Sequence, residues 1–159
     1  MVVKRAVYEQ LGGFYAVHYG EDWEMWARIA AHFPIAYSPR CLAHYRYLNQ
    51  ASITLRSLAT GQNIKDITTV IDIILGYLPA AERPRIRRIA RRHYAEYCAA
   101  VAHTLYETDP SAAFVQARGA LGMDVGVGVL FMVCKLYVKD FVRYEKRNKS
   151  WRGTAVSRA

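Results

Sequence analysis

The stretch "NIKDITTVIDIILGYL", residues 63–78, is the clearest structural signal in the chain. Its large apolar residues recur every three or four positions, as on one face of an α-helix, at Ile64, Ile67, Ile71, Ile74, Leu75 and Leu78. Several of them are β-branched, which also suits a strand. Because sixteen residues is long for a strand, we predict a helix here.

Similar periodicity on both sides predicts further elements. Helices are expected at 21–33, about 84–107, 110 to about 121, and about 125–147, with one or two helical turns before Gly12 and a frayed tail. Asp109 or Thr108 can cap the helix that begins with Pro110. Short strands are expected at "IAYSP", 35–39, and "CLAHYRY", 41–47, and an irregular segment at 48–60. The predicted fold class is mainly α with a small α/β portion.

Composition and charge set the class of protein. The 159 residues are 53% hydrophobic and 22% charged, as in globular proteins, and the net charge is +9. The excess of basic residues lies in 61–159, which suggests an anionic neighbour such as a membrane surface, a nucleic acid or a phosphorylated ligand. The longest apolar run, Val125 to Cys134, has ten residues, whereas a membrane-spanning helix needs about 20. We predict neither a spanning helix nor a signal peptide.

The three cysteines predict no metal site. Cys41, Cys98 and Cys134 lie far apart and form no ligand spacing typical of zinc. Reduced thiols in a cytoplasmic protein are the simplest interpretation.

Adjacent carboxylates, Glu21 and Asp22, open the predicted helix at 21–33. Acids at this position complement the helix dipole and cap free amides. The same amides would also keep a carboxylate ionised, so that it could accept a proton from a hydroxyl nucleophile facing a cleft. The acid pair alone does not distinguish capping from catalysis.

Several ordered motifs in the first third of the chain resemble one enzyme family. They are Lys4-Arg5, Leu11-Gly12-Gly13-Phe14, Gly20-Glu21-Asp22-Trp23, Arg28, Ile35-Ala36-Tyr37-Ser38-Pro39, and Tyr45-Arg46 with Ser52 and Thr54. Together they resemble the distal part of the catalytic domain of inverting family 2 glycosyltransferases, which have the GT-A fold. The resemblance implies a partial GT-A domain at 1–60, on the acceptor side, and a helical C-terminal extension with a basic tail at 61–159.

The resemblance also implies roles for individual residues. Asp22 would be the general base that deprotonates the acceptor hydroxyl for attack on a nucleotide sugar, with the acceptor being a glycan or a lipid-linked glycan. The implied substrate-binding residues are Glu21, Gly12, Gly13, Phe14, Trp23, Trp26 and Arg46. The tryptophans would stack on sugars, although their helical spacing favours core packing for at least one of them.

The chain departs from this family in its donor site. No Asp-x-Asp motif occurs, so the carboxylates that would hold a divalent metal, Mg or Mn, in a complete enzyme are absent. Leu48 stands where many relatives carry a histidine, and His44 is not an obvious substitute. The resemblance therefore implies a C-terminal fragment that is incomplete alone and binds no metal by itself, or a degenerate pseudo-enzyme fragment.

Two basic segments support an alternative from another class. The run "ERPRIRRIARRH", 82–93, reads as a solvated helix face or as a set of phosphate contacts. The segment 125–149 combines a bulky apolar face with lysines and arginines, like a helix at a membrane interface, or a terminal helix that packs on its own domain. The alternative function is a non-enzymatic basic helical module for an anionic membrane surface or nucleic acid. No base-reading motif favours nucleic acid. A protein of this kind would be cytoplasmic and peripheral at the inner membrane. Separately, an exposed sheet edge in the predicted α/β portion would favour a homodimer.

Overall fold

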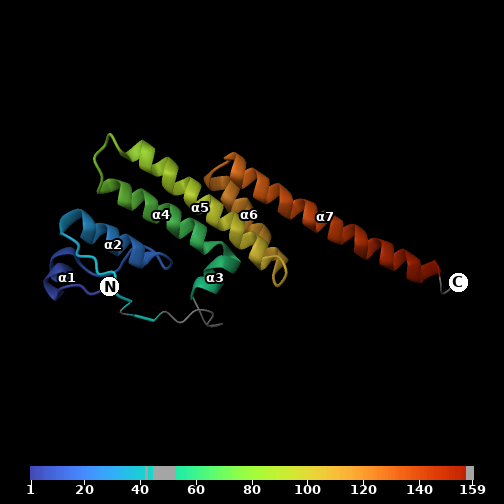
Figure 1. Ribbon diagram of the computed structural model, residues 1–159, viewed down its shortest axis with the longest axis horizontal. Helices are drawn as coiled ribbons and strands as arrows, with labels where there is room; N and C mark the ends of the chain where they lie inside the picture. The colour runs from blue at the N-terminus through green and yellow to red at the C-terminus, as the bar shows by residue number, and fades with distance from the viewer. Residues whose placement is uncertain (42, 45–52, 157–159) are drawn as a thin grey trace. The chain divides into compact units, whose positions relative to one another are not determined.

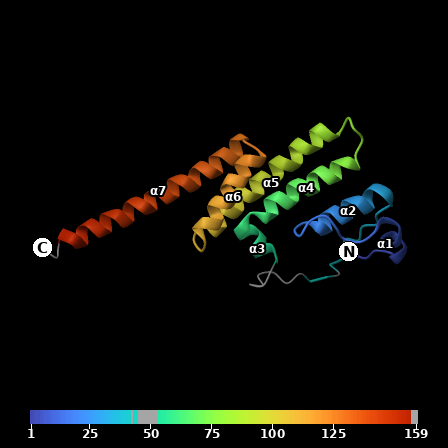
Figure 2. The ribbon, with the colours of Figure 1, turned by 180° about the vertical axis from the view of Figure 1, so that it is seen from behind.

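The computed structural model describes residues 1–41, 43–44 and 53–156, with side chains up to residue 146. All regular elements in these ranges are helices (Figures 1 and 2). They are α1 (Arg5–Leu11), α2 (Glu21–His32), α3 (Ile53–Thr60), α4 (Gln62–Gly76), α5 (Arg83–Leu105), α6 (Pro110–Met123) and α7 (Val127–Val156). The chain divides into two compact units, Met1–His93 and Tyr94–Ala159.

The first unit is built around α4. Helices α2 and α3 both pack on α4, and α1 packs on α2. The predicted apolar face of α4 is confirmed in part: Ile67, Ile71 and Leu75 are buried, whereas Ile64 and Ile74 are half-buried. Met25 and Ile29 of α2 are buried in the same unit. The 3.6-residue period of the sequence therefore positions α4 correctly.

The second unit contains the later part of α5 with α6 and α7. Small residues form the buried side of α6: Ala112, Ala113, Ala117 and Ala120. Asp109 caps α6, since its carboxylate accepts a hydrogen bond from the backbone N–H of Ala112 at 3.0 Å. This confirms one of the two predicted caps. A hydrogen bond of 2.8 Å between His103 Nε2 and the Met132 carbonyl oxygen joins α5 to α7.

The prediction of a small α/β portion is wrong for the described residues. The segment 35–39 has no regular structure, and neither do Cys41, Ala43 and His44. The rest of the second predicted strand, including Tyr45 and Arg46, lies outside the described residues. A strand needs a neighbouring strand for its backbone groups, and none exists in the described part of the chain.

Two other boundaries also differ from prediction. Residues 53–60, expected to be irregular, form α3, whose Ser57 and Leu58 are buried. The backbone of α7 continues to Val156, through the tail that was expected to fray. The division into domains after residue 60 stays a prediction.

The glycosyltransferase resemblance is also wrong. A GT-A domain is built on a central sheet, and the described residues of this chain form helices without a strand. The matched motifs have a local explanation in the helical fold. Gly12 ends α1 with a positive φ of 80°, and the Glu21-Asp22 pair begins α2. Turn glycines and acids at helix starts occur in unrelated folds for the same physical reasons.

Candidate functional site

The acid pair lies in the first turn of α2, where its negative charge complements the helix dipole. Asp22 is exposed, and its Oδ1 accepts a hydrogen bond of 2.8 Å from the backbone N–H of Trp23. Glu21 is half-buried in the first turn of α2. The catalytic role of Asp22 was implied by the glycosyltransferase resemblance, which the helical structure of the described residues contradicts.

The other predicted substrate-binding residues are only partly brought together. The Phe14 ring packs edge-on against Trp26, with centroids 5.7 Å apart. Trp23 is 41% exposed and makes no ring contact of this kind among the described residues. Gly12 and Gly13 lie in the loop between α1 and α2, whereas Arg46 lies outside the described residues.

A buried ion pair on α2 was missed by the sequence reasoning. The Glu24 carboxylate and the Arg28 guanidinium are 3.0 Å apart, and their side chains are 0% and 8% exposed. The Tyr77 hydroxyl donates a hydrogen bond of 2.6 Å to the other oxygen of Glu24. Burial and the Glu24 carboxylate raise the pKa of Tyr77 well above its usual value. Ionisable residues spaced i, i+4 within the apolar α2 pattern are the signal that could have revealed the pair.

Arg28 also fixes the loop between α1 and α2. Its guanidinium donates to the carbonyl oxygens of Leu11 at 2.6 Å and Gly13 at 2.8 Å. The same group lies over the Tyr15 ring, 4.3 Å from the centroid. These partners bind both terminal nitrogens of Arg28 and give it a structural role, because it holds the loop from inside the unit.

Asp66 of α4 holds the other end of this loop. Its carboxylate accepts hydrogen bonds from the backbone N–H groups of His18 at 3.2 Å and Tyr19 at 3.0 Å. The Gln62 amide donates a third, at 2.8 Å. The loop is thus anchored at both ends by side chains that bind its backbone.

Several arginines of the run at 82–93 have partners close by. Arg83 donates to the carbonyl oxygens of Gly76 and Leu78, which closes the turn between α4 and α5. Arg85 pairs with Glu82 at 2.7 Å, and Arg87 pairs with Asp72 at 3.2 Å. These contacts favour the solvated-face interpretation of the run over a phosphate-binding one.

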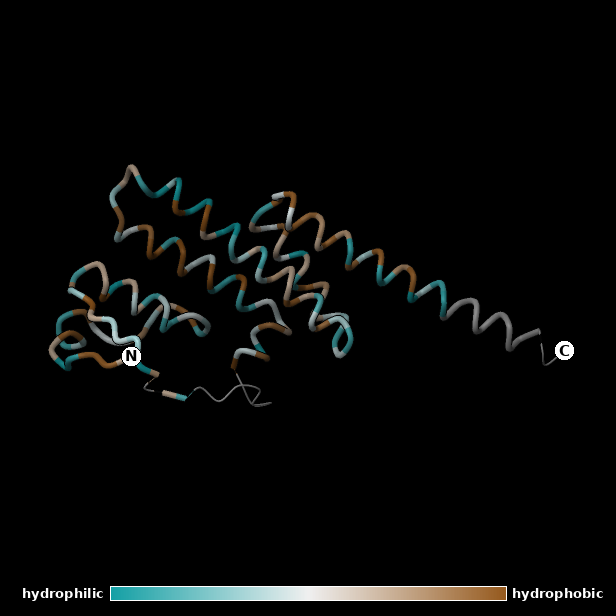
Figure 3. Tube along the Cα trace, in the orientation of Figure 1, coloured by the Kyte–Doolittle hydropathy of each residue, from teal (hydrophilic) through white to brown (hydrophobic). Residues whose placement is uncertain are grey.

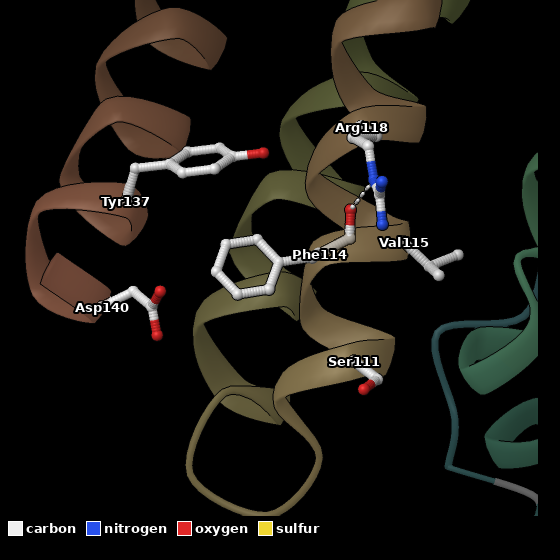
Figure 4. Close-up of a pocket in the computed structure, with 6 residues that line it drawn as sticks. All are labelled: Ser111, Phe114, Val115, Arg118, Tyr137 and Asp140. Carbon is white, nitrogen blue, oxygen red and sulfur yellow. Dashed lines mark hydrogen bonds between the residues drawn. The ribbon is translucent and has the colours of Figure 1, made fainter. Parts of the chain in front are cut away.

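A shallow pocket of about 500 Å³ lies in the second unit. Its lining comes from α6 and α7: Ser111, Phe114, Val115, Arg118, Tyr137 and Asp140. Figure 4 shows Phe114 extending from α6 toward α7, where its ring centroid is 5.1 Å from that of Tyr137. The Asp140 carboxylate already accepts a 2.7 Å hydrogen bond from Tyr106, and Arg118 donates to the Phe114 carbonyl oxygen. These engaged groups do not make a nucleophile–base pair.

Helix α7 carries apolar residues on two opposite sides. Val129, Val133 and Leu136 are buried within the second unit. Another row, which we call the α7 stripe, consists of the exposed residues Val127, Phe131, Cys134, Val138 and Phe141. At about 100° per residue the stripe lies roughly opposite the buried row. Figure 3 shows hydrophobic positions recurring along α7 between polar ones. The domain's own packing therefore satisfies only one apolar side of α7.

Basic residues flank the α7 stripe on one side. Lys135 and Lys146 are exposed and lie next to it in the helical order. Lys139 and Arg143 lie further from the stripe and contact Glu107. Tyr137 and Tyr144, both about half exposed, lie on the opposite flank. The α7 surface thus has an apolar centre, a basic edge and an aromatic edge.

Comparisons with protein-family models, with curated proteins and with solved structures find no match to this chain. Among the helices that the structure describes, none has both the length and the apolar character needed to cross a membrane. The described residues also contain no group of three or more His, Cys, Asp or Glu side chains placed to hold a metal ion. What the fold and site define is a helical protein whose most distinctive exposed feature is the α7 surface.

Proposed function

We propose that this protein binds anionic membrane surfaces by laying α7 along the lipid interface. The single observation that carries the proposal is the exposed α7 stripe with a basic edge, on the side of the helix that its own domain leaves uncovered. An interfacial helix buries such an apolar face among acyl chains while its basic residues meet the headgroup phosphates. Phe131 and Phe141 are the bulkiest members of the stripe and would contribute most of the apolar burial.

Charge favours anionic lipid over a second copy of the chain. The stripe has four- and three-residue steps, which also suit a coiled-coil seam. A partner copy, however, would place its own Lys135 and Lys146 against a protein with a net charge of +9, and these like charges would repel each other. An anionic bilayer supplies the opposite charge, and each basic residue near it contributes about 1 kcal/mol.

Nucleic acid is the less suitable anion for this surface. A nucleic-acid surface offers phosphates but no apolar layer that would cover Phe131, Val138 and Phe141. The exposed apolar residues are thus better matched by lipid than by a polyanion in water.

Co-sedimentation with vesicles tests the proposal. The protein is expected to pellet with phosphatidylcholine vesicles that contain phosphatidylglycerol, less with pure phosphatidylcholine, and less again as salt is raised. The double variant Phe131→Ser/Phe141→Ser should lose about 2–4 kcal/mol of binding free energy. A fully buried phenylalanine contributes about 1.5–3 kcal/mol, and about two thirds of each of these side chains is exposed and can be buried by lipid. Ile35→Ser removes an exposed apolar side chain of the first unit and is the matched control.

Two results would overturn the proposal. One is wild-type protein that stays in the supernatant with anionic vesicles at low salt. The other is a dimer, seen by sedimentation equilibrium, that the double variant abolishes while vesicle binding is unchanged.

A further inference from the structure

Glu107, in the turn between α5 and α6, engages two of the basic residues of α7. Its carboxylate oxygens lie 2.5 Å from Lys139 Nζ and 3.4 Å from Arg143 Nη1. All three side chains are about half exposed to solvent. The pair of cations therefore already has an anionic partner inside the protein.

The Tyr106 ring completes this arrangement. Lys139 Nζ and the Arg143 guanidinium carbon lie 5.0 and 5.6 Å from its centroid, within the range of cation–π attraction. The ring itself is buried and oriented by the hydrogen bond from its hydroxyl to Asp140. The aromatic face and the carboxylate together hold both cations near the α5–α6 turn, away from the α7 stripe.

The geometry points to Glu107 as an internal competitor of the phosphate headgroup for Lys139 and Arg143, a contact that limits membrane affinity until anionic lipid displaces it. This inference rests on the proposed function of α7. A phosphate oxygen accepts the same charge-assisted hydrogen bonds as a carboxylate oxygen. Because exposed ion pairs are weak, a surface dense in phosphate can replace Glu107. While Glu107 holds Lys139 and Arg143, the basic edge offers lipid Lys135 and Lys146, which form no ion pair within the described residues.

Vesicle binding by Glu107→Gln tests the inference. The variant keeps the shape of the side chain and removes the competing charge. We expect its partition constant on phosphatidylglycerol-containing vesicles to rise about fivefold if one cation is released and about 30-fold if both are. The matched control is Glu9→Gln, which removes one carboxylate from an exposed ion pair with Arg5 in the first unit. Circular dichroism checks that each variant keeps its helical content.

A double-mutant cycle separates competition from a general effect of charge. In a Lys139→Gln/Arg143→Gln background the gain from Glu107→Gln should disappear, because no cation remains to be released. A gain that persists there, or an equal gain from Glu9→Gln, would overturn the inference. Equal binding by wild type and Glu107→Gln would also overturn it, while leaving the proposed function in place. Failure of both proteins to bind anionic vesicles would reject the proposed function and the inference with it.

Discussion

Replacing Arg28 by methionine should destabilise the first unit strongly. Methionine keeps much of the apolar stem but removes the guanidinium, which contacts Glu24, the Leu11 and Gly13 carbonyl oxygens, and the Tyr15 ring. Glu24 would remain, fully buried, with the Tyr77 hydroxyl as its hydrogen-bond donor. The variant thus tests whether one buried cation supports both an ion pair and a loop.

The expected magnitude follows from these contacts. Removing one partner of a buried ion pair costs about 3–5 kcal/mol, because the other charge is left uncompensated. The backbone carbonyl oxygens of Leu11 and Gly13 can turn to water, so their lost hydrogen bonds are included in that range rather than added to it. Since a whole domain is stable by about 5–15 kcal/mol, this single change removes a large share of the stability of the unit.

Urea denaturation followed by circular dichroism measures the effect. With a slope of about 1–3 kcal/mol per molar urea, the midpoint should fall by about 2 M. Arg85→Met is the control, since Arg85 pairs with Glu82 on the exposed surface and such pairs contribute about 0–1 kcal/mol. The double variant Glu24→Gln/Arg28→Met should be less destabilised than the sum of its single variants by at least about 1 kcal/mol.

The reasoning is refuted if Arg28→Met shifts the midpoint no more than Arg85→Met does. It is also refuted if the losses of stability caused by Glu24→Gln and Arg28→Met are strictly additive in the double variant. Either result would mean that water or a rearranged loop compensates the buried carboxylate at little cost.

Two further predictions concern the same unit. Gly20→Ala should destabilise the first unit by about 1–2 kcal/mol or more in thermal melts. Gly20 has a φ of +83°, and an added Cβ would lie 2.7 Å from Ile67 Cδ1. Gly13→Ala is the control and should change the melting temperature little, because the space around Gly13 is open. Because burial and the Glu24 carboxylate raise the pKa of Tyr77 in the folded state, the stability from its neutral hydroxyl is present below about pH 10 and declines as pH rises above it. The free energy of unfolding should thus fall more steeply above about pH 10 in wild type than in Tyr77→Phe, and equal slopes would contradict the assignment.

The sequence predicted helices well where their signal is local. The apolar period of 63–78 identifies α4, and Asp109 followed by Pro110 marks the start of α6 to the residue. The prediction for residues 53–60 was wrong because the polar residues of 48–60 suggested an irregular segment. The burial of Leu58 within the first unit instead favours a helix there. The strand at 35–39 failed because pairing depends on a distant segment that local alternation cannot reveal.

The candidate site was predictable only in part. The basic and apolar composition of 125–149 was visible in the sequence and led to the interfacial hypothesis. The sequence did not show which apolar row of α7 would be covered, because that depends on how α7 packs on α6. The i, i+4 spacing of Glu24 and Arg28 is local, but Tyr77 lies 53 positions from Glu24, so no local pattern contains the whole cluster. The motif match misled because "GGF" and "ED" are common signs of helix ends.

The loop between α1 and α2 is held mainly through its main chain. Arg28 binds its carbonyl oxygens, and Asp66 binds its N–H groups at His18 and Tyr19. Main-chain groups are the same for nearly every amino acid, so an exposed position such as His18, held through its backbone N–H, can vary without altering the path of the backbone. This segment is therefore a natural place to graft foreign peptide sequences or to build a combinatorial library on a fixed frame.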